Sequence, residues 1–342
     1  MEEDSMLDSQ EIIQETPAED VFIAPSIDAD QILSGASYAH YTPIPETITQ
    51  DMSTECVLGV DEAGRGPVLG PMVYALLYLP LASHHSLLAK THHFDDSKVL
   101  TPAVRSSLMQ TLCTPHTDLH QQCGWAAKVM SARDISAGML KPAGTYNLNA
   151  QAMDTTIELI KGVFAMGVNI KEIYIDTIGS PQVYQKKLER IFPTTQVTVA
   201  KKADSLYPCV SAASVCAKVT RDAALEVCYR TYASEATNSD KEEQVEGWGS
   251  GYPSDARCSS WLRRNMDPVF GWGSECRFSW GTAKDLLESK AAGGTKVVWP
   301  AVDEEDESMR VTDYFSATSG AQGAADEGLA SWYGTSVTEQ VF

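Results

Sequence analysis

Four acidic residues stand where an α/β protein would end its strands, and together they could bind metal ions. Asp61 and Glu62 close the apolar run VLGV, and Asp176 closes the segment YID. Asp204 follows the segment VTVAKKA. Ligands of α/β sheets gather at the carboxyl ends of strands. Carboxylates crowded there need counter-charge, and oxygen-only ligands suit Mg²⁺ or Mn²⁺ rather than zinc. The pattern therefore predicts a divalent-cation site.

Two of these acids also have ordinary interpretations. Asp204 could cap the helix that follows it, and Asp176 stands before a Thr-Ile-Gly turn. Asp61 and Glu62 are harder to explain in this way, because no basic residue precedes them in the strand and an unpaired buried carboxylate is costly. The recurrence of the same chemistry at three separate strand ends favours a site.

The segment Gly64-Arg65-Gly66 directly follows the acidic pair. Glycine weakens helices and strands but lets the backbone turn sharply and approach a ligand closely. Successive strand residues point to opposite faces, so Asp61 and Glu62 can serve one site only if the chain turns here. The segment predicts a turn whose backbone reads a ligand.

The remaining pattern predicts a mixed α/β sheet, with an antiparallel hairpin part followed by parallel crossovers. Residues 181–192 are expected to form a helix with Val183, Leu188 and Ile191 on one face. The other expected helices are 147–167, 207–232, 255–266 and 281–292. The expected strands are 57–60, 68–79, 125–130, 172–176 and 196–200.

The formal net charge of −20 belongs to the two ends of the chain. Residues 1–50 hold 11 acidic and no basic residues, and residues 301–342 hold nine acidic residues and one basic residue. The middle holds 26 acidic and 25 basic residues, so the overall charge does not exclude a polyanionic substrate. The composition predicts a disordered acidic tail over 1–50, with order beginning near Cys56, and a second acidic tail over 295–342.

The cysteines, histidines and apolar runs argue against secreted, zinc-binding and membrane proteins. The eight cysteines form no CxxC pair and no secretory signal is apparent, so free thiols in a reducing compartment are expected. Six of the seven histidines lie between His84 and His120 without zinc spacing, and we expect a solvated loop there. The apolar run Pro67–Ala82 is too short to span a membrane and is broken by Pro71 and Pro80.

Six sequence blocks resemble the signature blocks of type 2 ribonuclease H, the ribonuclease HII family. They are DEAGRGPVLGPMV, DDSKVLT, YNLNAQAMD, YIDTIGSP, KADSLYPCVSAASVCAKVTRD and GSGYPSD, in the family's order from about Val57 to Trp280. Two later segments, Asp267–Phe270 and Arg277–Trp280, resemble those of the family's eukaryotic catalytic A subunit. The resemblance implies a ribonuclease H-like catalytic domain over 51–232, and a charged loop with a helical part carrying the tyrosine motif over 233–294.

The resemblance also implies an activity. Asp61, Glu62, Asp176 and Asp204 match the family's catalytic metal ligands, for two Mg²⁺ or Mn²⁺ ions per site. The implied enzyme is an endoribonuclease that hydrolyses the RNA strand of RNA/DNA hybrids. It also incises 5′ of ribonucleotides embedded in duplex DNA, leaving 5′-phosphate and 3′-hydroxyl ends. The implied roles are ribonucleotide excision repair and removal of RNA primers.

The resemblance assigns substrate recognition to several further residues. Gly64, Arg65 and Gly66 are expected to detect the ribose 2′-hydroxyl, and Tyr252 to stack on the deoxyribose just 3′ of the ribonucleotide. Without the resemblance, Tyr252 would be interpreted as an ordinary turn aromatic before a proline. Lys98 and Asn147 are expected to contact phosphate and ribose.

The last expectations concern binding partners, cellular location and alternative functions. The resemblance implies accessory subunits B and C and a nuclear location, although no localisation signal is evident. The segment with Val311, Tyr314 and Phe315 resembles a degenerate sliding-clamp peptide, with packing on the accessory subunits or an incidental acidic tail as alternatives. The rival functions are a type 1 ribonuclease H, which lacks the glycine and tyrosine motifs, and an inert scaffold that binds RNA/DNA hybrids.

Overall fold

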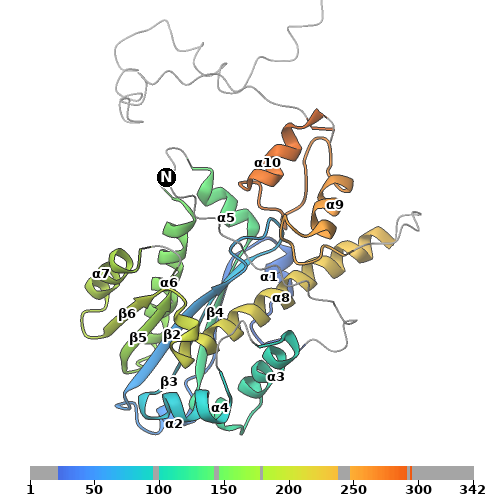
Figure 1. Cartoon of the computed structure of the whole chain (residues 1–342). Coiled ribbons are helices and arrows are strands. Elements are labelled where there is room, and N and C mark those ends of the chain that lie inside the picture. The colour runs from blue at the N-terminus through green and yellow to red at the C-terminus, as the bar shows by residue number, and fades with distance from the viewer. Residues whose placement is uncertain are drawn as a thin grey trace, which may run out of the picture. The chain divides into compact units, whose positions relative to one another are not determined.

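A computed structural model shows a six-stranded sheet with helices on both faces (Figure 1). The structure describes residues 22–94, 100–141, 146–177, 180–237, 247–290 and 293–294. The strands lie in the order β1-β4-β3-β2-β5-β6. Their bounds are β1 Tyr38–Tyr41, β2 Cys56–Ala63, β3 Met72–Pro80, β4 Gly124–Met130, β5 Ile170–Asp176 and β6 Gln196–Ala200. This order places β2 inside the sheet, between β3 and β5.

Two kinds of pairing meet at β2. It runs antiparallel to β3, which pairs antiparallel with β4, and β4 pairs antiparallel with β1. On its other side β2 runs parallel to β5, and β5 runs parallel to β6. The predicted mixed sheet, with an antiparallel part and parallel crossovers, is confirmed. Because β2 and β5 are parallel, their carboxyl ends lie at the same edge of the sheet.

The central strands are buried on both faces because their apolar side chains alternate between two cores. On β2, Val57 packs in the core beneath α8 (Pro208–Thr237), whereas Cys56 and Leu58 pack in the opposite core. Every residue of β3 is buried. This two-sided burial explains why the sequence shows continuous apolar runs here instead of an alternating pattern.

Long helices cover each face of the sheet. α8 covers one face, and α6 (Leu148–Ala165) with α7 (Pro181–Ile191) covers the other (Figure 1). None of the helices in the described ranges is long and apolar enough to cross a membrane. The other α-helices of the described ranges are α1 Ala29–Leu33, α2 Glu46–Thr49, α3 Pro102–Cys113, α4 Asp118–Gln122, α5 Ala132–Met139, α9 Ala256–Arg264 and α10 Gly281–Glu288. η1 Leu81–Ser83 and η4 Ala203–Ser205 are short 3₁₀ helices, and η2 His84–Thr91 is a π-helix.

The predicted element boundaries hold best for the parallel strands and least for the ends of the helices. β6 has the predicted bounds, but α8 continues to Thr237, so residues 233–237 extend the helix and do not begin the predicted loop. Val183 does not share the buried face of α7, since it is 68% exposed while Leu188 is fully buried. Five helical residues span about 500° of rotation, which puts these two side chains on different faces.

The prediction that residues 1–50 form a disordered tail is wrong for residues 22–50. β1, with the sequence YAHY, is an edge strand that pairs antiparallel with β4, which satisfies the backbone groups on one side of it. Ile48 of α2 is fully buried, and the Ser26 hydroxyl lies 2.9 Å from the Thr220 hydroxyl of α8. A few apolar anchors and one strand pairing therefore order this segment. Residues 1–21 lie outside the described part.

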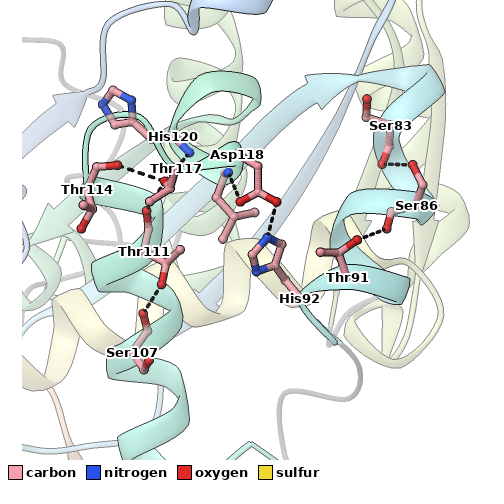
Figure 2. Close-up of polar contacts among 11 residues, drawn as sticks. Ser83, Ser86, Thr91, His92, Ser107, Thr111, Thr114, Thr117, Asp118 and His120 are labelled. Carbon is pink, nitrogen blue, oxygen red and sulfur yellow. Dashed lines mark hydrogen bonds and ion pairs between the residues drawn. The ribbon is translucent and has the colours of Figure 1, made fainter.

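The histidine-rich segment 84–120, predicted as a solvated loop, carries η2, α3 and α4 instead. His84 is buried, and its Nε2 accepts a hydrogen bond of 3.2 Å from the Cys209 amide near the start of α8. Burial lowers the pKa of His84 to about 4, so the neutral ring is the acceptor. His92 Nε2 lies 2.8 Å from Asp118 Oδ2, and this contact joins the end of η2 to α4 (Figure 2). These polar side chains hold helices together.

The C-terminal helices form a third core. Its members come from the segment after β2, from α8 and from the region of α9 and α10, and include Leu69, Leu225, Trp248, Trp261 and Cys276. Leu69 also pairs with Cys276 as an isolated β-bridge. This contact explains why the predicted strand 68–79 begins only at Met72, because the residues before it pack against the C-terminal part.

Candidate active site

The carboxyl ends of β2 and β5 bring Asp61 and Asp176 together. Val60 lies opposite Ile175 in the parallel pair, so the next residue on each strand is one of the two aspartates. Parallel neighbours at the same register point to the same face of the sheet. The pairing register therefore places these two carboxylates side by side.

Asp204 approaches from the turn that follows β6. It lies in η4, four residues beyond Ala200, which pairs with Asp176. α8 begins only at Pro208, so Asp204 does not occupy the helix-capping position that the sequence allowed. Asp61 interacts electrostatically with both Asp176 and Asp204. The three segments singled out in the sequence thus meet at one place.

Asp61 is buried, as Asp204 is, with 6% of its surface exposed. One of its oxygens accepts a 2.8 Å hydrogen bond from the Glu62 amide, and its carboxylate accepts another from the Ser214 hydroxyl of α8. Burial raises the pKa of Asp61 above its ordinary value, and repulsion from Asp176 adds to the shift. Such crowding of carboxylates in a poorly solvated place is a feature of functional sites.

Glu62 faces Arg65, whose guanidinium lies 3.9 Å from the Glu62 carboxylate. Burial and the neighbouring Asp61 raise the pKa of Glu62, while Arg65 opposes the shift. The Arg65 side chain also hydrogen-bonds to Asn149 of α6 and to the Tyr74 hydroxyl of β3. The arginine between the two glycines therefore anchors its loop to the sheet and to α6.

Sequence reasoning chose Asn147 from the YNLN block, and the structure gives it a capping position. Its Oδ1 accepts hydrogen bonds from the Asn149 amide (3.0 Å) and the Ala150 amide (3.1 Å) at the start of α6. The asparagine that meets Arg65 is Asn149, which the sequence reasoning missed. The same block contains both residues, and the helix start alone decides which of them points to the site. Lys98, Val311, Tyr314 and Phe315 lie outside the described residues.

The donor set fits a hard divalent cation, because it consists of carboxylate oxygens only. In the described part of the chain, no group of three or more His, Cys, Asp or Glu side chains already surrounds one metal position. Asp176 accepts from the Ala203 amide (2.9 Å), and Asp204 accepts from the Ser205 amide (3.1 Å). The strand ends therefore hold the carboxylates close together, and local amides set the orientation of each one.

The two glycines of the loop are required by their surroundings. Gly64 has φ +77°, and a Cβ atom there would lie 2.9 Å from the Pro71 carbonyl oxygen. A Cβ atom on Gly66 would lie 2.9 Å from Cε1 of the Tyr252 ring. Only glycine fits such positions without displacing its neighbours. Gly66 and Tyr252, assigned separately from the sequence, are thus in direct contact.

Two residues near the C-terminal end of the described chain donate hydrogen bonds to the backbone of the Gly64–Gly66 loop. Arg277 is fully buried and donates hydrogen bonds to the carbonyls of Gly64 (2.6 Å), Arg65 (2.9 Å) and Gly70 (3.0 Å). The Trp280 indole donates to the Gly66 carbonyl (3.0 Å) and stacks under Arg277. Sequence reasoning noted the RFSW segment as a family signature only and missed this supporting role.

Tyr252 lies on a second loop fixed to the first. Its side chain is 40% exposed. The Gly251 carbonyl accepts from the Val68 amide (2.9 Å), and buried Arg221 donates to the Ser250 carbonyl (2.5 Å). Asp255, the N-cap of α9, accepts from the Ser250 amide (2.8 Å). The tyrosine is therefore held in place by its backbone, with its ring left open to solvent.

A pocket of about 220 Å³ opens beside the carboxylates. Glu62, Asp176, Arg65 and Asn149 are among the polar residues that line it. Val183, the exposed valine of α7, belongs to its apolar wall. A concave surface with a few converging polar groups is the usual form of a binding site. A ligand can therefore reach Glu62 and Asp176 from this side.

Comparison with known proteins identifies the family. The family model for Ribonuclease HII matches residues 58–283. The chain belongs to the ribonuclease HII family. The A subunit of ribonuclease H2 from Neurospora crassa is 56% identical over 94% of this chain and 97% of its own length. The corresponding human A subunit is 42% identical over 80% of this chain and 85% of its own length. The resemblance stated from the sequence is confirmed, and the chain is a type 2 ribonuclease H.

Solved structures of the family share this fold. The crystal structure of ribonuclease H2 from Pyrococcus horikoshii OT3 matches with a TM-score of 0.51 and 25% identity, over 67% of this chain and 96% of that one. A ribonuclease HII from Archaeoglobus fulgidus, solved in complex with PCNA, matches with a TM-score of 0.51 and 26% identity, over 66% and 94%. The predicted ribonuclease H-like mixed sheet is confirmed, and so is membership of an enzyme family that acts on RNA/DNA.

Proposed function

We propose that this type 2 ribonuclease H cuts RNA/DNA hybrids and also incises 5′ of single ribonucleotides in duplex DNA, leaving 5′-phosphate and 3′-hydroxyl ends. One observation carries the proposal. The carboxylate group of Asp61, Glu62, Asp176 and Asp204 adjoins a loop whose Gly66 packs on Tyr252. The proposed catalytic carboxylates and the proposed substrate-recognition residues therefore lie next to each other.

The carboxylates would hold two Mg²⁺ or Mn²⁺ ions. When bound, such ions neutralise charge on the phosphate and activate the attacking water. Asp61 is central, since it interacts with Asp176 and Asp204 and neighbours Glu62, so it would be a main residue in holding the ions. Ser214 and the Glu62 amide orient Asp61, and Arg65 balances the charge of Glu62.

Cleavage of a duplex with one ribonucleotide tests the proposal most directly. The chain, with and without co-expressed partners, is given this duplex, a full RNA/DNA hybrid and an all-DNA duplex, each in Mg²⁺ and in EDTA. We expect cleavage of the first two in Mg²⁺ only. An enzyme that cuts the hybrid but not the single-ribonucleotide duplex would have type 1 specificity, and binding without any cleavage would indicate the inert scaffold.

We also propose that the backbone of Gly64, Arg65 and Gly66 detects the ribose 2′-hydroxyl while Tyr252 stacks on the next deoxyribose. The carbonyls of Gly64 and Arg65 are bound by Arg277 and that of Gly66 by Trp280, which fixes the loop before substrate arrives. A rigid backbone reads the shape of a sugar more strictly than a mobile side chain does.

Gly66→Ala tests this recognition surface. The new Cβ would press on the Tyr252 ring at 2.9 Å, so loop or ring must shift. Because misplacement of a positioning group by about 1 Å can cost ~10²-fold, we expect kcat/KM on the single-ribonucleotide duplex to fall about 10²-fold. Gly281→Ala is the control, since a Cβ there meets nothing within 4 Å. Equal kinetics for the two variants would refute the proposed role of the Gly66–Tyr252 contact.

Accessory subunits B and C and a sliding clamp are proposed as partners. The relatives are named as the A subunits of ribonuclease H2, and the archaeal structure contains PCNA. Val269 and Phe270, 78% and 80% exposed, form an apolar tip that would suit accessory subunits. Two hydrogen bonds of 2.8 Å from their amides to Asp267 Oδ1 keep this tip rigid.

Pull-down of the full chain separates the two partner surfaces. We expect the double variant Tyr314→Ala/Phe315→Ala to lose capture by a purified clamp, and Phe270→Ser to weaken capture of accessory subunits. Loss of subunit capture by the tail variant would assign the tail to the subunits instead. Unchanged capture of both partners by the tail variant would leave Val311, Tyr314 and Phe315 without a binding role.

Ribonucleotide excision repair, removal of RNA primers and a nuclear location are proposed from the substrate chemistry, since ribonucleotides enter duplex DNA where DNA is replicated. Imaging of the tagged chain, together with alkali-sensitive sites in genomic DNA after its deletion, tests these proposals. Exclusion of the chain from the nucleus or an unchanged number of alkali-sensitive sites would contradict them.

A further inference from the structure

We infer that Ser214 of α8 is a positioning residue for Asp61, and that Gly59 of β2 sets the distance between them. The inference rests on the proposed function, in which Asp61 holds the metal ions. Ser214 belongs to none of the residues that the sequence marked for chemistry, and it touches neither the recognition loop nor Tyr252 in the contacts described above.

The Asp61 carboxylate accepts hydrogen bonds from two different elements. The Glu62 amide donates from its own strand, and the Ser214 hydroxyl donates from α8. Ser214 is fully buried, so its hydroxyl does not exchange this bond for one with bulk water. Two donors from separate directions restrict how the carboxylate can rotate, whereas the strand amide alone would restrict it less.

Gly59 explains how α8 comes close enough. A Cβ atom there would lie 2.3 Å from the Cys209 carbonyl carbon and 2.5 Å from the Val210 nitrogen, so the helix backbone lies directly on the strand. Gly59 and Asp61 are two residues apart and point to the same face. The absence of a side chain at Gly59 thus brings the first turn of α8 against the face that carries Asp61.

The spacing along the two elements agrees with this arrangement. Gly59 to Asp61 spans about 6.6 Å of strand. Val210, whose nitrogen meets Gly59, and Ser214 are four residues apart, which is about 6 Å of helix and nearly one turn, so they lie on one face of α8. Contact at the first pair therefore brings the second pair into register, with strand and helix running in the same direction. The backbone contact at Gly59 sets the distance between α8 and β2. This distance lets the Ser214 hydroxyl reach the Asp61 carboxylate.

A hydroxyl suits this position chemically. It donates a hydrogen bond without bringing a positive charge, so the full negative charge of Asp61 stays available for a cation. Hydrogen bonds to ligating carboxylates orient the ligand, and their loss typically costs roughly 10–100-fold in metal affinity. Ser214→Ala removes the donor and leaves the helix backbone in place.

Mn²⁺ binding by the full chain, with its copurifying subunits and without substrate, tests the inference by isothermal titration calorimetry. We expect Ser214→Ala to weaken Mn²⁺ binding by roughly 10–100-fold. Thr220→Val is the matched control, because it removes another buried hydroxyl of α8 whose partner is Ser26. Its thermal unfolding should shift as much as that of Ser214→Ala, with Mn²⁺ binding unchanged. Ser214→Cys, which keeps a weak donor, should give an intermediate affinity and serves if Ser214→Ala does not fold.

Asp61→Asn is measured beside these variants to separate the positioning role of Ser214 from the metal site itself. If it weakens Mn²⁺ binding and Ser214→Ala does not, the positioning role is wrong and the proposed metal site stands. If neither changes Mn²⁺ binding, the metal assignment itself fails. If Ser214→Ala and Thr220→Val weaken binding equally, the effect is a general one of α8 and the inference is overturned.

Discussion

Asp61→Asn is expected to reduce cleavage of an RNA/DNA hybrid by at least ~10³-fold, because several kcal/mol of transition-state stabilisation depend on the bound ions. Asparagine keeps the shape of the side chain and an oxygen for the Ser214 hydroxyl, but it loses the charge that holds a cation. Single-turnover cleavage in Mg²⁺ measures the effect, since a slow chemical step then appears directly in the rate.

The same variant should be more stable than the native chain at neutral pH when metal is removed with EDTA. Burial raises the pKa of Asp61, so between its unfolded and folded pKa values the folded chain holds a proton that the unfolded chain has lost. Stability contributed by this group therefore falls as pH rises through that range. Thermal unfolding at about pH 5 and about pH 8 should show a larger advantage of Asp61→Asn at the higher pH.

Asp285→Asn is the matched control, because Asp285 is an exposed acid on α10 far along the chain from the site. It should leave both the cleavage rate and the pH dependence of unfolding unchanged. Normal cleavage by Asp61→Asn would show that this carboxylate holds no catalytic ion.

Arg277→Met is expected to lower the free energy of unfolding by at least about 3 kcal/mol, because it leaves three carbonyls without their donor and each unsatisfied buried group costs roughly 1–3 kcal/mol. Those carbonyls belong to Gly64, Arg65 and Gly70. Burial lowers the pKa of Arg277 to about 9, so removing a costly buried charge offsets part of the loss. Urea unfolding measures the change.

Arg277→Met should also change the relative activity of the enzyme on its two substrates. Without Arg277 the loop that faces the sugar is no longer fixed, so we expect kcat/KM on a single-ribonucleotide duplex to fall more than on a full hybrid. Arg277→Lys should not restore it, since an ammonium cannot reproduce the planar fork that reaches three carbonyls. Arg230→Met is the control, at a largely exposed arginine that pairs with Glu226 on the same helix. Stability within ~1 kcal/mol of the native chain, the size of an ordinary substitution effect, with selectivity retained, would contradict the assignment of Arg277.

The parts of the fold that could be predicted from the sequence are those governed by local pattern. β5 and β6 are apolar runs bounded by turns, and α6 has apolar residues at helical spacing. The acidic residues Asp61 and Asp176 were recognisable because each directly closes such a run. In these cases the nearest neighbours in sequence are enough to state where the backbone goes and which end carries the acid.

Features made by distant contacts were not predictable in this way. β1 is a segment of only four residues, which becomes a strand because it pairs with β4, about 90 residues later. His84 looked like part of a solvated cluster, and its burial depends on α8. Arg277 and Asn149 were missed because their partners, the loop carbonyls and Arg65, lie far away along the chain. A local sequence pattern does not show which distant residue a side chain will contact.

The hydrogen bonds from Arg277 to the loop also imply an order of assembly. They join residues 207 to 213 positions apart, so during synthesis the loop emerges long before its support. All six strands, η4 and α8 precede Arg277 in the chain. The sheet and its four carboxylates are therefore synthesised before the residue that fixes the loop. During synthesis, the proposed catalytic carboxylates would be present first, and the arginine that fixes the proposed sugar-recognition loop would come last.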